Sequence, residues 1–289
     1  MQYTNDHLWL EPKHRMKFKF AAILLTILLY QDNDLYRVVN DDSHAISKQL
    51  NKELKRGDVV SPGDSISFLK ANSMLRLTSR AGTGAISQSG TVIAKDPESR
   101  HWLSLENGVD ATRPTAIRTG RGSSINSSLM LTNYLKTMAS QPAPLLIIDS
   151  LTLEVSGTYY NRRSQETISV QYRYQGKQVR KNLKWKEQGH TRYLLLDHIL
   201  FPQTTAPVPV TFYKTTAGSS PVLMAENRIV LCSSAEIIPE LKTINATMSK
   251  NDVVEAEILH DALYNYLSAY FGMPDTDDFF HHILPLVKQ

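Results

Sequence analysis

Cysteine is nearly absent from this chain, which has one such residue, Cys232, among 289. A single cysteine excludes both an intramolecular disulfide and a zinc site built from cysteines, so packing must stabilise the fold. Cys232 ends the strand-like run Asn227–Cys232. At that position we expect a buried, unreactive thiol rather than a nucleophile.

Several functional signatures are also missing. The nine histidines contain no His-Glu-x-x-His spacing, and the chain has no Gly-x-Ser-x-Gly elbow and no P-loop. We therefore predict no metal site, no cofactor and no catalytic residue that a motif would identify. The net charge of +4 is too small to indicate nucleic-acid binding by the whole chain.

Long hydrophobic runs are lacking as well. The longest, Phe20–Tyr30, has eleven residues, whereas a membrane-spanning helix needs about 18 and a signal-peptide core about 7–15. Basic residues precede this run and acidic residues come after it: Lys13, Arg15, Lys17 and Lys19, then Asp32 and Asp34. This asymmetry favours translocation of the chain beyond Tyr30 across a membrane. We predict that residues 1–30 are an N-terminal extension with a signal peptide or short anchor, and that the protein is exported to the periplasm or cell envelope.

Two alternatives to a cleaved signal stay open. Leu28, Leu29 and Tyr30 offer no small residue for a signal peptidase, so Phe20–Tyr30 could stay on the protein as a membrane tether. A run of this length is equally compatible with a buried strand or helix of the folded body.

Short β-type runs alternate with turn residues in the first half of the chain. The runs are Leu35–Val39, Asp58–Val60, Ser65–Leu69 and Met74–Thr78. Gly57-Asp58 and Gly63-Asp64 lie between them, and this residue pair is typical of tight turns. A calcium loop would need further oxygen ligands nearby. The pattern predicts a small antiparallel β domain.

The segment Leu54–Phe68, with both Gly-Asp turns, and Met74–Leu77 after it resemble the core of FecR-like periplasmic β-domains. The resemblance covers about 45 residues. At the position of the family's later Asp-Gly-Ser motif, this chain has Arg80-Ala81-Gly82. It implies a sensing or scaffolding module without catalytic residues to carry over.

A helix is expected from Ser127 to Ala139, because its apolar residues are spaced mostly by three and four. Pro142 and Pro144 come after it and indicate a domain boundary. We therefore expect a first β domain at 31–140, FecR-like in part and ending in this helix, and a second β domain at 141–235.

The clearest element of the second domain is a predicted hairpin. Apolar residues alternate with polar ones on both sides of a Gly176-Lys177 turn, up to Trp185. We expect one apolar and one basic face, and the basic face is our candidate binding site: Arg173, Lys177, Arg180, Lys184 and Lys186. Such a face suits an envelope protein or an anionic glycan or lipid surface. The alternative is a solvated face that only discourages edge-to-edge aggregation.

The last segment, 236–289, is predicted to be helical. Asp252 and Glu255 form a capping-box-like start, an apolar stripe comes next, and Gly272 and Pro274 end the helix. A second helix is expected to begin near Asp275. The fold class expected is therefore mainly β with α, comprising two antiparallel β-sandwich or barrel-like domains and a C-terminal helical hairpin.

These features together predict an exported, non-enzymatic envelope protein that acts as a binding, scaffold or regulatory component. The rival class is an envelope hydrolase whose site forms only in three dimensions. Asp149, His190 and His198 are the residues that would have to converge with a serine.

Overall fold

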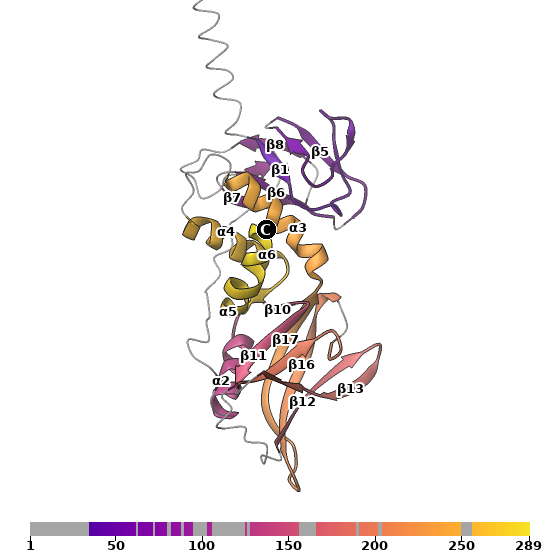
Figure 1. Cartoon of the computed structure of the whole chain (residues 1–289). Helices are drawn as coiled ribbons and strands as arrows, with labels where there is room; N and C mark the ends of the chain where they lie inside the picture. The colour runs from indigo at the N-terminus through magenta and orange to yellow at the C-terminus, as the bar shows by residue number, and fades with distance from the viewer. Residues whose placement is uncertain are drawn as a thin grey trace, which may run out of the picture. The chain divides into compact units, whose positions relative to one another are not determined.

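The computed structural model describes residues 35–61, 63–71, 73–79, 82–87, 90–94, 103–105, 125, 128–155, 166–188, 191–201, 204–249 and 256–289. The predicted leader Phe20–Tyr30 and His190 lie outside these ranges. The chain divides into two compact units, Met1–Ala81 with Ala85–Asp110 and Gly82–Gly84 with Ala111–Gln289. The fold is mainly β with α, as expected (Figure 1). None of the helices in the described part of the chain has the length and hydropathy needed to cross a membrane.

The first unit consists of short strands in two sheets. One sheet has the order β4 (Val59–Val60), β1 (Tyr36–Val38), β6 (Leu75–Ser79) and β7 (Gly82–Ile86). The other has the order β3 (Lys52–Glu53), β2 (Ala45–Ser47), β5 (Ser65–Phe68), β8 (Gly90–Ala94) and β9 (Leu103–Leu105). Strand pairs such as β1–β6 and β2–β5 are antiparallel, which confirms the predicted small antiparallel domain.

The two Gly-Asp pairs form turns in this unit. Gly57 and Gly63 have φ of 89° and 87°, a region that glycine adopts readily. The Asp58 carboxylate accepts hydrogen bonds from Lys55 N at 2.9 Å and Lys52 Nζ at 2.7 Å. The Asp64 carboxylate accepts from Gln49 N and from the Ser47 hydroxyl. Asp58 therefore holds its own turn, as the sequence indicated, whereas Asp64 bonds to the distant Ser47–Gln49 segment.

The second unit is built on a six-stranded sheet. Its order is β13 (Lys177–Asn182), β12 (Glu166–Tyr174), β16 (Thr204–Thr216), β17 (Val222–Cys232), β10 (Leu145–Ile148) and β18 (Met273–Pro274). The expectation of purely antiparallel pairing is wrong for β10, which runs parallel to β17 and β18. All four residues of β10 are buried, as is usual for a strand covered on both faces.

The hydrophobic core of this unit lies between two layers. A three-stranded sheet, β11 (Ser150–Val155), β15 (Thr191–Asp197) and β14 (Lys184–Gln188), and the helix α2 (Ser128–Ala139) pack with one face of the six-stranded sheet. Leu131 and Leu135 of α2 belong to this core, and Asn227 Nδ2 donates to Leu135 O at 2.8 Å. The β-sandwich arrangement is thus present, but α2 packs with the second unit and does not end the first one as we expected.

The C-terminal helices are more numerous than the predicted hairpin. They are α3 (Ser234–Met248), α4 (Ala256–Tyr270), α5 (Thr276–Asp278), the π-helix η1 (Phe279–Ile283) and α6 (Leu284–Lys288). In Figure 1 they gather near the β10 end of the six-stranded sheet. The end of α4 and the helix after Asp275 agree with the prediction, whereas the Asp252–Glu255 capping box lies outside the described residues. Tyr266 Oη donates to Glu240 Oε2 at 2.7 Å and thereby connects α4 with α3, which lies mostly in the segment predicted to be helical but was not one of the two helices specified.

Candidate binding hairpin and open sheet face

Strands β12 and β13 form the predicted hairpin, with a turn at Gln175-Gly176. The turn is one residue earlier than predicted. Gln175 and Gly176 both have positive φ, 49° and 77°, which is typical of the type I′ turn that suits the twist of two adjacent strands. The register places Tyr174 opposite Lys177, Tyr172 opposite Val179 and Val170 opposite Lys181.

The hairpin does not carry its cations on a single face. Residues directly opposite each other in an antiparallel pair share a face, so Lys177 and Lys181 lie on the side of Tyr172, which belongs to the core. Arg173 and Arg180 lie on the other side. The expectation of a single basic face is therefore wrong, because the exposed cations lie on both faces of the hairpin.

Lys184 and Lys186 are separated from the other candidate residues. Leu183 is buried, donates its N–H to Ile168 O at 2.9 Å and ends the hairpin. Lys184 and Lys186 then lie in β14, which belongs to the three-stranded sheet. The predicted binding set thus divides into Arg173, Lys177 and Arg180 on the hairpin and two lysines elsewhere.

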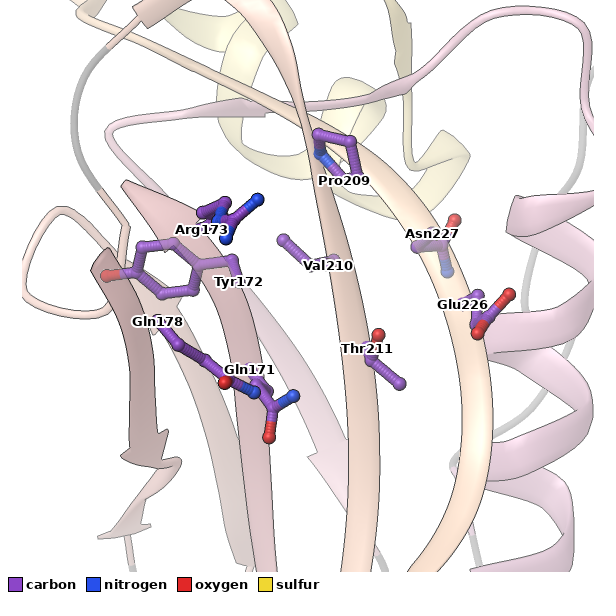
Figure 2. Close-up of a pocket in the computed structure, with 9 residues that line it drawn as sticks. All are labelled: Gln171, Tyr172, Arg173, Gln178, Pro209, Val210, Thr211, Glu226 and Asn227. Atoms are coloured by element: carbon purple, nitrogen blue, oxygen red, sulfur yellow. The ribbon is translucent and has the colours of Figure 1, made fainter. Parts of the chain in front are cut away.

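The outward face of the sheet beside the hairpin is hollowed (Figure 2). The hollow measures about 440 Å³, and its lining comes from β12, β13, β16 and β17: Gln171, Tyr172, Arg173, Gln178, Pro209, Val210, Thr211, Glu226 and Asn227. Register places Gln171, Thr211 and Glu226 in one row across three strands. The short side chains of Pro209 and Thr211 are thus flanked by longer polar ones. This arrangement can hydrogen-bond an extended polar chain.

The three candidate cations on the hairpin differ in their freedom to bind. Arg180 is fixed on the sheet, because its Nε donates to Ser169 Oγ at 3.1 Å and its guanidinium lies 5.4 Å from the centroid of Tyr213. The Arg173 side chain is exposed and makes no hydrogen bond or ion pair with any described residue. The same holds for the Lys177 side chain within the described ranges. Arg173 and Lys177 are therefore the side chains best placed to meet an anion.

The residues proposed for a hydrolase have other partners. Asp149 Oδ1 accepts from Ser234 N at 2.9 Å and so caps α3. Pairing of Ser150 with Asp197 brings Asp149 and His198 to the same end of β11 and β15. No hydrogen bond among the described residues joins these two side chains to each other or to a serine hydroxyl, and His190 lies outside those residues.

Within the same ranges, no group of three or more His, Cys, Asp or Glu side chains is arranged to hold a metal ion. No protein-family model matches the chain, and a comparison with curated proteins found no match.

The hollow on the outward sheet face was not predicted from the sequence, because the rows of residues that line it depend on how β12, β16 and β17 pair. Pro209 and Thr211 gave no distinct signal, because most residues of β16 are Thr, Ala, Pro or Val.

Proposed function

We propose that the protein is a non-enzymatic binding or scaffold component of the cell envelope, reached by export, which contacts an anionic partner through the β12–β13 hairpin. The observation that carries this proposal is the exposure of Arg173 and Lys177 on opposite faces near the hairpin turn, each without an ion pair to a described residue. Exposed, unpaired cations attract anions over about 8 Å at physiological salt.

The local charge supports this choice. Strands β12 and β13 carry four cations, Arg173, Lys177, Arg180 and Lys181. Glu166 is the only acid in these two strands, and its Oε1 lies 3.5 Å from Lys214 Nζ. The hairpin therefore presents net positive charge to solvent, whereas the +4 of the whole chain is spread over 289 residues.

Export is the second part of the proposal. It is supported by the basic cluster before Phe20–Tyr30 and by the resemblance of Leu54–Phe68 to FecR-like periplasmic domains. Fractionation of cells that make the full chain, with intact-mass measurement of the product, tests it. Recovery from the periplasm or envelope is expected, and the mass tells a cleaved signal from a retained tether. Recovery from the cytosol alone would contradict export.

The binding part is tested with charge-neutralised variants of the full chain. The test variant is Arg173→Gln/Lys177→Gln/Arg180→Gln. The control, Lys184→Gln/Lys186→Gln/Lys242→Gln, removes the same charge from exposed positions in β14 and α3. Three probes present the anion in different chemical forms: phosphatidylglycerol vesicles, heparin and poly-L-glutamate.

At least one of these probes should bind the wild type in a salt-sensitive way. At about 0.5 kcal/mol per contact, the test variant should bind it roughly tenfold more weakly than the control variant. The probe that binds tells a lipid, a glycan and a protein partner apart. Equal binding by the two variants, or no binding to any probe, would contradict the proposal.

A further inference from the structure

Strand β13 is an exposed edge of the six-stranded sheet. It lies outside β12 in the strand order, and five of its six residues are exposed, with Val179 half-buried. An edge strand of this kind has a row of backbone N–H and C=O groups that face solvent, and such a row can pair with another extended chain.

The hairpin turn determines which backbone groups face outward. In a two-residue hairpin the flanking pair, here Tyr174 and Lys177, bonds mutually, and bonded pairs then alternate with non-bonded ones along the ladder. Leu183 N donates to Ile168 O at 2.9 Å, and Ile168 and Leu183 are a pair that this alternation predicts to be bonded. Lys177, Val179 and Lys181 therefore bond to β12. The N–H and C=O of Gln178, Arg180 and Asn182 point away from it, and the described residues offer them no backbone partner.

The charge of β13 restricts what can pair with it. In a symmetric antiparallel pairing with a second copy of this chain, centred on Arg180, the two Arg180 side chains would face each other, and like charges directly opposite are destabilising. Lys177 adds free positive charge on the other face. Lys181 Nζ is held by Ile199 O at 2.6 Å. An acidic segment would instead place carboxylates beside Lys177 and Arg180.

We propose that an extended acidic segment of a partner protein adds to β13 as a further strand of the sheet, bonding to the outward backbone groups of Gln178, Arg180 and Asn182. The inference rests on the proposed function, because it names the partner class and the binding mode of the same hairpin. Backbone bonds supply the alignment, and the cations on both faces select acidic over basic segments.

The test uses the full chain and a short synthetic peptide in which pairs of glutamates alternate with pairs of threonines, so that carboxylates lie on both faces of the added strand. A peptide with lysine in place of glutamate is the control. Hydrogen exchange is followed by NMR at individual amides. The acidic peptide should slow exchange at Gln178, Arg180 and Asn182, and leave Val179 and Lys181 nearly unchanged because these amides are already bonded. The lysine peptide should have no effect.

A proline variant separates backbone pairing from charge. Gln178→Pro removes one outward N–H without changing charge, and proline is tolerated in edge strands. Gln178→Ala keeps that N–H and is the matched control. The proline variant should bind the acidic peptide about fivefold more weakly than the alanine variant. Unchanged exchange at Val179 and Lys181 in the peptide-free proline variant verifies that the hairpin is intact.

The outcomes distinguish this inference from the proposed function. Equal affinity of the two Gln178 variants, with no protection at the three outward amides, would refute strand addition and leave the binding role in place if the charge variant still binds weakly. Equal binding of acidic and basic peptides would refute both. Protection of the three amides in a dimer of the chain alone would show that a second copy is the occupant, and would also overturn the inference.

Discussion

At the scale of single residues, Gly272 is the position where the fold most requires glycine. Its φ is 141°, and an added Cβ would lie 2.7 Å from Pro144 O, the same oxygen that accepts from Met273 N. Gly272→Ala should lower the free energy of unfolding by about 2 kcal/mol or more, because strain and a displaced backbone contact add. Gly218→Ala, at φ 77° with open space around its Cβ, should cost about 1 kcal/mol. Urea unfolding measures both, and equal losses would contradict this view of Gly272.

Cys232 is the second residue with a measurable consequence. Burial, with the charges of Glu236 and Glu240, raises the pKa of its thiol from 9.0 to about 11. A raised pKa in the folded state means that the stabilisation is complete below pH 9 and is lost as pH rises through about 11. The difference in unfolding free energy between wild type and Cys232→Ala should therefore shrink over that interval. A difference that stays constant with pH would show that the folded thiol titrates normally.

At the scale of elements, helix α3 depends on its first turn. Ser233 Oγ accepts from Ala235 N at 3.2 Å, and Glu236 stands three residues after Ser233. Ser233→Ala should destabilise the second unit by about 1 kcal/mol, whereas Ser233→Asp should preserve stability, because aspartate is an equally good N-cap. Thermal unfolding monitored by circular dichroism tests this, and equal melting temperatures for the alanine and aspartate variants would contradict it.

Elements specified by nearby residues could be predicted from the sequence. The short strands of the first unit, the Gly57-Asp58 and Gly63-Asp64 turns and the end of α4 at Gly272 were predicted correctly, because turn conformation and alternation are local properties. The segment from 236 on was predicted to be helical, but the separate helix α3 and its start were not specified, although Ser233 and Glu236 have capping-box spacing. Pro239 lies inside that helix and is normally unfavourable there.

Elements that depend on distant partners were not predictable in the same way. The parallel pairing of β10 requires β17 and β18, which lie far along the chain. The wrong expectation of a single basic face had a local signal that was overlooked: an apolar face through Val179 and Leu183 would also contain Lys181. The hollow beside Arg173 depends on the register of three strands, and a sequence pattern does not specify register between strands of similar alternation.

At the scale of the whole molecule, the chain comprises two compact units, and the proposed binding hairpin belongs to the second one. The first unit contains two small sheets, whereas in the second unit β12 pairs with β16 over Glu166–Tyr172, so the hairpin is part of the packed six-stranded sheet. A packed sandwich fixes the hairpin's register, so that its cations and its free edge keep a constant arrangement. Such rigidity favours recognition, because little ordering entropy is lost on binding.

The central claim is that this hairpin is where an anionic partner binds. Chemical-shift mapping of the isotope-labelled full chain with poly-L-glutamate tests it most directly. The account predicts that the shifted amides cluster at Arg173 and over Lys177–Asn182, and that the shifts diminish as salt is raised. Shifts centred on Lys184 and Lys186 in β14, on the C-terminal helices or on the first unit would contradict it.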